Sequence, residues 1–160
     1  GKRIEEQVTV LRELWEKPLV TFDGKWHQLD RVGINPLPIQ QPIPIWFGGG
    51  HDNVLRRIAE MGDGWMPPFQ EAKDAKPSLL KIEGFTQQVG RNMKDIGIEP
   101  RLSLGEGTPE NWMTIISDWQ EVGANYLSVN TLNLGWTKPV QHMDALKAFA
   151  REMPPKSFEI

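Results

Sequence analysis

Three consecutive glycines and a histidine, Gly48-Gly49-Gly50-His51, are the residues of this sequence best placed to hold a ligand. They follow an apolar run at residues 43–47 and precede a segment with apolar residues at helical spacing. A glycine loop between a strand and a helix leaves unpaired backbone N–H groups at the positive end of the helix dipole. Such a corner binds phosphate without any charged side chain. The alternative is that the glycines only form a tight turn, and the loop by itself favours neither.

One acid and three histidines are the other candidates for chemistry. Glu106 stands between two glycines after a predicted strand, where it would act on a substrate or bind a cofactor, although a carboxylate beside the helix start at Thr108 is the commoner outcome. His51 would either donate to a phosphate or be an ordinary loop residue. His27 in a hairpin and His142 on the last helix are expected at the surface. No two histidines have the spacing of metal ligands, so the sequence predicts no metal site.

Arginine and serine side chains offer weaker candidates. Arg56 and Arg57 follow the glycine loop, where either would add a charge-assisted contact to a phosphate. The fourth or fifth residue of a helix usually points away from its N-terminus, so we expect solvated arginines. Ser103 and Ser128 lack a histidine at the spacing of a hydrolase triad, so neither is expected to be a nucleophile.

A strand before the glycine loop and a helix after it must position the loop. Residues 43–47 are nearly all apolar, as expected of a parallel strand buried on both faces. Trp46, like Trp65 in the next strand, is therefore expected in the core. Asp52 is predicted to cap the helix, and Gly62 to end it in the left-handed conformation.

The rest of the chain repeats this alternation. Residues 2–16 are predicted to form an amphipathic helix, and residues 20–29 a β-hairpin in which Asp23-Gly24 makes a type I′ turn. A further helix is predicted over residues 77–96, with Gly97 as its end. Alternating strands and helices indicate an α/β fold with a parallel sheet and helices outside it, in a single domain over residues 1–160. The strand–helix units are predicted over residues 43–62, 64–97, 101–123 and 126–153.

Composition excludes several classes of function. The 160 residues carry a formal net charge of −3 with both signs interspersed, which gives no case for binding nucleic acid or an anionic membrane surface. No apolar stretch is long enough to span a bilayer. The lack of cysteine excludes disulfides and thiolate chemistry and fits a cytoplasmic protein.

The sequences PIWFGGG at residues 44–50, LRRIA at 55–59 and GDGW at 62–65 resemble the bacterial luciferase-like oxidoreductases. These are flavin- and deazaflavin-dependent enzymes and monooxygenases built on a (β/α)8 TIM barrel. The resemblance implies FMN or the deazaflavin coenzyme F-420 as cofactor and a small organic molecule as substrate. The residues that would bind the cofactor phosphate are Gly48, Gly49, Gly50, His51 and Asn53.

The same resemblance implies that the chain is too short for a complete barrel. A complete barrel takes roughly 250 residues, and this chain corresponds to the C-terminal half, with the fourth helix and strands five to eight. The half that carries most substrate and proton-transfer residues in the family is absent, so the catalytic residues are unknown and the chain alone is expected to be inactive. We expect a fragment, or half of an assembly completed by a second copy or by a separate N-terminal half. The alternative is a natural small open α/β sheet.

Three functions are consistent with these observations. The leading hypothesis is the C-terminal half of a luciferase-like oxidoreductase that contributes the phosphate-binding loop. The second is a flavin-binding or assembly protein without catalysis, formed by a half-barrel oligomer. The third is a structural α/β oligomer in which the glycine loop is only a turn.

Overall fold

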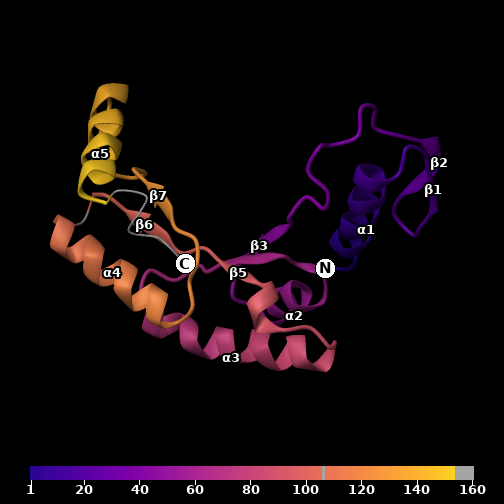
Figure 1. Ribbon diagram of the computed structural model, residues 1–160, viewed down its shortest axis with the longest axis horizontal. Coiled ribbons are helices and arrows are strands. Elements are labelled where there is room, and N and C mark those ends of the chain that lie inside the picture. The colour runs from indigo at the N-terminus through magenta and orange to yellow at the C-terminus, as the bar shows by residue number, and fades with distance from the viewer. Residues whose placement is uncertain (106, 154–160) are drawn as a thin grey trace.

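Parallel strands run through the middle of the molecule. The computed structural model describes residues 1–105 and 107–153 (Figure 1). One sheet has the order β3-β4-β5 and a second pairs β6 with β7, and every pairing within these two sheets is parallel. The strands are β3 (Trp46–Gly48), β4 (Gly64–Met66), β5 (Gly97–Ile98), β6 (Arg101–Ser103) and β7 (Ser128–Asn130).

The sequence predicted a single parallel sheet of four strands, but Pro100 divides it into the sheet β3-β4-β5 and the pair β6-β7. β5 and β6 belong to the same extended segment, separated by Glu99 and Pro100. Proline has no N–H to give to a ladder, so the regular pairing is interrupted there. The Glu99 N–H still donates to the Trp65 carbonyl (3.0 Å), and the Ser128 N–H donates to the Pro100 carbonyl (2.9 Å). The segment therefore lies between β4 and β7, and all the strands keep one direction.

Three helices cover one face of these strands. Figure 1 shows α2 (Asp52–Met61), α3 (Ala72–Gln88) and α4 (Pro109–Glu121) along one side, with α5 (Pro139–Glu152) at one end. The core between helices and strands consists of Leu55, Ile58, Trp65, Ala72, Ala75, Ile82, Ile96, Ile98 and Trp119. A smaller core lies beneath α5 and consists of Leu102, Leu104, Trp112, Ile116, Phe149 and Met153.

The opposite face of the strands is not covered in this way. Successive side chains of a strand alternate between faces, so the burial of Trp65 against the helices places Gly64 on the other face. The Trp46 ring lies over Gly64, where an added Cβ would come within 2.1 Å of it. Its edge-to-face neighbour is Tyr126, at 5.0 Å between ring centroids, and Tyr126 is 54% exposed. The prediction that the first strand is buried on both faces is therefore wrong, because helices cover only one of them.

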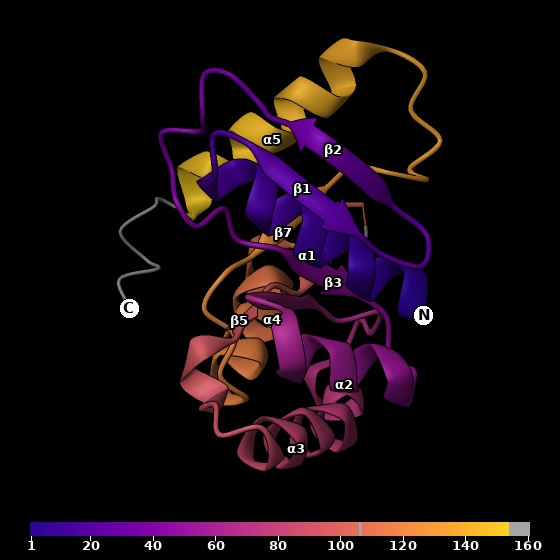
Figure 2. The same cartoon turned by 90° about the vertical axis from the view of Figure 1, so that its right-hand side faces the viewer.

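The helix α1 (Lys2–Glu16) matches its predicted range and packs beside a hairpin of β1 (Val20–Asp23) and β2 (Gln28–Val32). Figure 2 shows the hairpin, α1, β3, α2 and α3 following one another from top to bottom. The hairpin is longer than predicted and has no type I′ turn, because Gly24 does not have a positive φ.

The connection in the hairpin is instead organised by one carboxylate. Glu6 accepts hydrogen bonds from the backbone N–H groups of Lys25, Trp26 and His27 at 2.9, 2.8 and 2.7 Å. A Cβ at Gly24 would come within 2.4 Å of Phe22, so glycine is required there for space.

Several helix ends also differ from prediction. Gly62 has an extended conformation (φ −85°, ψ 154°) in place of the predicted left-handed one. α3 begins five residues before Pro77, because Ala72 and Ala75 are buried in the core and their burial offsets the cost of the proline. The same helix ends at Gln88, followed by Gly90 in the left-handed region (φ 71°), and Gly97 belongs to a strand. A 3-10 turn, η1 (Met93–Asp95), lies between them.

None of the helices in residues 1–105 and 107–153 combines the length and the apolar character needed to cross a bilayer.

Candidate functional site

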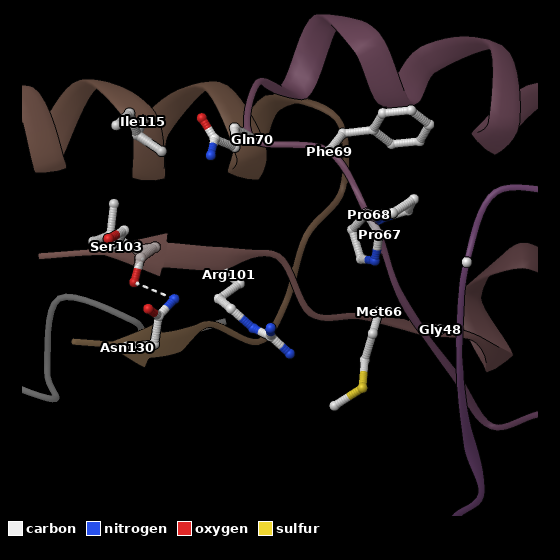
Figure 3. A pocket seen from close by; sticks show the side chains of 12 residues that line it. Gly48, Met66, Pro67, Pro68, Phe69, Gln70, Arg101, Ser103, Ile115 and Asn130 are labelled. Carbon is white, nitrogen blue, oxygen red and sulfur yellow. Dashed lines mark hydrogen bonds between the residues drawn. The ribbon is translucent and has the colours of Figure 1, made fainter. Parts of the chain in front are cut away.

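A cavity of about 420 Å³ lies where the parallel strands end (Figure 3). It opens at the carboxyl ends of β3, β4, β6 and β7, which is where open and closed parallel α/β sheets hold their ligands. Its size falls in the range of sites for small molecules. The lining residues are Gly48, Gly49, Met66, Pro67, Pro68, Phe69, Gln70, Arg101, Leu102, Ser103, Ile115 and Asn130.

The glycine loop forms one wall of this cavity and is tied to β4. Gly49 has φ 118°, which side-chain-bearing residues rarely adopt. Its carbonyl accepts a hydrogen bond from the indole nitrogen of Trp65 (2.8 Å), and its N–H donates to the Met66 carbonyl at 3.4 Å. The N–H of Gly49 is therefore used in strand pairing. Gly50 is exposed, and a Cβ there would lie 3.4–3.5 Å from Phe69 and Pro68.

The N-terminus of α2 follows directly. His51 and not Asp52 is the N-cap, and its Nδ1 accepts a hydrogen bond from the Asn53 N–H (3.3 Å). In the described part of the chain, the N–H groups of Gly50, His51 and Asp52 donate to no protein acceptor. Three amides at the positive end of a helix are a suitable set of donors for an anion.

The Asp52 side chain does not cap the helix and instead forms an ion pair with Lys81, with 2.7 Å between the ammonium nitrogen and the carboxylate oxygen. The hydrogen bond from Lys81 holds the pKa of Asp52 below its usual value. The carboxylate is ionised at neutral pH, as aspartate ordinarily is, and its charge is balanced by the ammonium group of Lys81.

The five predicted phosphate-binding residues thus occupy different positions. Gly48 and Gly49 line the cavity, and Gly50 borders it beside Phe69. His51 and Asn53 are exposed at the helix start and do not line it. Phosphate binding by this corner remains a prediction, with Gly50, His51 and Asp52 as the available amides.

The two arginines of α2 do not reach the loop. The Arg56 guanidinium lies 4.2 Å from the centroid of the Phe85 ring. Arg57 is only 8% exposed and pairs with Glu5 of α1 at 3.1 Å, so the expectation of a solvated side chain is wrong for this residue. The error arose because the partner lies 52 residues away in the sequence.

The remaining candidates have structural partners. His27 contacts the Glu6 carboxylate through Nδ1 (2.9 Å) and is half-buried. His142 is half-buried, with Nδ1 2.8 Å from the Thr131 hydroxyl and its ring against Trp136. Glu106 lies outside the described residues.

Neither serine has a histidine partner among the described hydrogen bonds. Ser128 donates to Glu99, and Ser103 lines the cavity. No group of three histidine or acidic side chains in residues 1–105 and 107–153 converges to bind a metal.

Two residues that shape the cavity, Trp119 and Arg101, were missed by the sequence reasoning. Trp119 donates from its indole nitrogen to the Gln70 carbonyl (3.2 Å), which fixes the loop after β4 much as Trp65 fixes the glycine loop. Arg101 brings a cation into the cavity. The sequence did contain a signal for Arg101. Side chains alternate between the two faces of a strand, so Arg101 and Ser103 lie on one face of β6 and Leu102 on the other.

The cavity is suited to binding and orientation. Its lining offers an apolar side, a polar side and a corner of backbone donors. Among the described residues that line it there is no histidine or carboxylate, so none of them is equipped to move a proton at neutral pH.

Comparison with known proteins gives a consistent result. A family model described as luciferase-like monooxygenase matches residues 1–123. The chain is 31% identical over 91 residues to an uncharacterized protein of Mycobacterium tuberculosis, in a match covering 57% of this chain and 31% of that protein. It is 31% identical over 108 residues to an F420-dependent glucose-6-phosphate dehydrogenase of Kineococcus radiotolerans, covering 65% of this chain and 32% of that one. These matches span about a third of the length of the curated relatives.

The fold is similar to that of solved proteins much longer than this chain. The coenzyme F420-dependent tetrahydromethanopterin reductase of Methanopyrus kandleri superposes with a TM-score of 0.78 at 15% identity. That superposition covers 98% of this chain and 63% of the reductase. At this identity the likeness concerns the fold alone.

Proposed function

Because the chain belongs to the luciferase-like monooxygenase family, we propose that it is the cofactor-phosphate-binding half of a flavin- or deazaflavin-dependent oxidoreductase. The observation that carries this proposal is the glycine corner, where the N–H groups of Gly50, His51 and Asp52 have no acceptor among the described residues and lie beside a cavity of ligand size. A phosphate needs such donors.

The residues present fit a cofactor with a flat ring and an anionic tail. The amides of Gly50, His51 and Asp52 would hold the phosphate, with Gly48 and Asn53 at its sides. Met66, Pro68 and Phe69 offer apolar surface to the ring system. FMN and the deazaflavin coenzyme F-420 share this combination. When bound, FMN would supply hydride or oxygen chemistry to a small organic substrate, and the deazaflavin would supply hydride chemistry. The residues of this chain would bind and orient the cofactor and the substrate, and would exclude water from them.

We further propose that the chain, as one domain, is the C-terminal half of a (β/α)8 barrel. The parallel strands with helices on one face support this, as does the exposed side chain of Tyr126 on the other face. Within the described residues, β3 and β7 each pair on one side only. A second copy of the chain, or a separate N-terminal half, would complete the cylinder. Light scattering should then show a dimer or a complex with that half, and a monomer at all concentrations and in all mixtures would contradict this step.

Ligand titration tests the phosphate corner directly. We expect FMN or the deazaflavin coenzyme to raise the melting temperature of the chain, since a ligand at about 100 times its dissociation constant adds about 2.7 kcal/mol to stability. Gly50→Asp places a carboxylate at the amides, where space exists for a Cβ, and should abolish the shift while leaving the unliganded protein folded. Gly84→Asp is the matched control, because nothing lies within 4 Å of a Cβ at that position. Equal shifts for both variants would contradict the proposal.

A flavin-binding or assembly protein without catalysis is the second candidate. The described lining residues include no histidine or carboxylate, which fits this candidate and equally fits the first, where those groups would come from the other half. Bound cofactor with no reductase or monooxygenase activity in the completed assembly would support it over the first.

A further inference from the structure

We propose that Arg101 and Ser103 form a binding site for the carboxylate of a small apolar organic acid. The inference rests on the proposed function, since the acid would be the substrate held beside the cofactor. It assigns a role to a cation that neither the fold nor the phosphate corner uses.

The geometry of β6 and β7 puts polar groups together on one face. Arg101 is paired with Ser128 in register, and Ser103 with Asn130. Because residues two apart lie about 6.6 Å apart along a strand, the guanidinium and the Ser103 hydroxyl are within reach of one small anion. Figure 3 shows Arg101 extending between Asn130 and Met66.

Two donors at this site have no partner of their own. Among the described residues, the side chains of Arg101 and Ser103 make no hydrogen bond, and Arg101 takes part in no ion pair. Arginine presents a planar fork of donors that matches a carboxylate with two parallel hydrogen bonds. Asn130 is already held, since it donates to the Leu102 carbonyl (3.5 Å) and accepts from the Leu132 N–H (3.0 Å).

The charge balance favours a monoanion. Glu99 stands two residues before Arg101 on the same face and receives the hydroxyl of Ser128. Its carboxylate offsets part of the arginine charge and would repel a phosphate dianion at this place. A singly charged carboxylate is attracted by the guanidinium with less opposition, whereas the glycine corner offers a separate site for phosphate.

The opposite wall of the cavity determines which organic group, besides the carboxylate, the ligand can have. Met66, Pro67, Pro68 and Phe69 face the polar strands across the cavity (Figure 3). Such a wall favours an apolar body of small size, while Arg101, which is exposed, meets the carboxylate at the polar side of the cavity. The ligand class is therefore a short aliphatic or aromatic monocarboxylic acid.

Titration of the full chain followed by amide NMR tests this site, with benzoate, its neutral counterpart benzamide, and inorganic phosphate as probes. We expect benzoate to shift the amide signals of Leu102, Ser103 and Phe69 and to bind about tenfold or more tightly than benzamide, in line with a charge-assisted hydrogen bond. Arg101→Met should weaken benzoate about tenfold. Arg3→Met, the same change at an exposed position of α1, should have no effect.

The outcomes separate this proposal from the previous one. Loss of benzoate binding in Arg101→Met with FMN binding retained supports the carboxylate site. Loss of both, or a preference of this site for phosphate, would overturn it by assigning Arg101 to the cofactor. On the parent chain, equal binding of benzoate and benzamide, or no response to benzoate, would also overturn the proposal. This test does not depend on whether the Arg101→Met variant folds. Benzoate binding without any FMN binding would keep the carboxylate site and refute the phosphate corner.

Discussion

The two faces of the parallel strands differ in what covers them. On one face Trp65 is completely buried, with its indole nitrogen bonded to the glycine loop and its ring among helix side chains. On the other face Trp46 is only half-buried and has Tyr126, itself more than half exposed, as its aromatic neighbour. Two tryptophans of similar sequence context thus have different environments.

The two faces differ in their roles: the covered face contributes to folding stability, and the uncovered face carries the groups that could recognise a ligand. The covered face buries apolar side chains, which is the main source of folding free energy. The uncovered face carries charge and hydroxyl groups at Glu99, Arg101 and Ser128, and these are costly to bury without partners. The covered face therefore contributes most of the folding free energy, and the uncovered face carries the polar groups to which the proposed ligand would bind.

The largest expected effect comes from replacing the two tryptophans. Trp65→Ala should lower the free energy of unfolding by about 3–5 kcal/mol, because it removes a fully buried ring and a hydrogen bond. Trp46→Ala should cost less, about 1–2 kcal/mol, since its side chain is only partly buried. Urea denaturation of both variants measures the difference, and equal losses would remove the distinction between the faces.

Glycine substitutions sharpen the comparison. A Cβ at Gly64 would meet the Trp46 ring at 2.1 Å, so Gly64→Ala should destabilise the chain by about 1–3 kcal/mol. Gly84 lies in α3 with nothing near its Cβ position, so Gly84→Ala should stabilise by about 0.5–1 kcal/mol. Thermal unfolding of Gly64→Ala and Gly84→Ala, each compared with the parent chain, measures the two changes in stability. A neutral Gly64→Ala would show that Trp46 is mobile enough to move aside.

The attachment of α1 should give a smaller effect. Glu5→Gln leaves the buried Arg57 guanidinium without its anion and should cost about 1 kcal/mol, given the partial exposure of Glu5. Glu13→Gln removes a solvent-accessible pair with Lys17, the C-cap of the same helix, and should cost less than about 0.5 kcal/mol. Chemical denaturation that ranks the two variants in reverse would contradict the role given to Arg57.

The smallest effect is a dependence on pH at the hairpin. Partial burial acts to raise the pKa of Glu6, but the hydrogen bonds from Trp26, His27 and Lys25 outweigh it and leave the pKa below the usual 4.5. The resulting stabilisation is fully present above that value and is lost as the pH falls through the lower pKa of the folded state. The unfolding free energy of the parent chain should therefore drop more steeply than that of Glu6→Gln below about pH 4.5. Parallel profiles would show that the ionisation of Glu6 makes no difference to stability.

The glycine corner was predictable from sequence because it is local. Strand, glycines and helix follow one another within twenty residues, and the pattern of apolar residues gives both elements. The parallel strands and the start of α4 after Thr108 were predictable for the same reason. The cap at His51 in place of Asp52 was not, since Lys81 of another helix takes the aspartate.

The features that were missed depend on contacts between distant residues. Glu6 organises a loop about twenty residues further along the chain, which overrides the turn preference of Asp-Gly. Glu5 buries Arg57 by a contact across 52 residues. Arg101 enters the cavity only because β6 lies beside β7 with β4 on the other side of its segment. Local propensity contains none of this information.

Amide NMR of the chain with FMN and with inorganic phosphate is the most direct test of the central claim. The account predicts that the largest shifts of both titrations fall on the N–H groups of Gly50, His51 and Asp52, and that Gly50→Asp removes them. Shifts confined to other parts of the chain, or no shift at this corner at concentrations that raise the melting temperature, would contradict it.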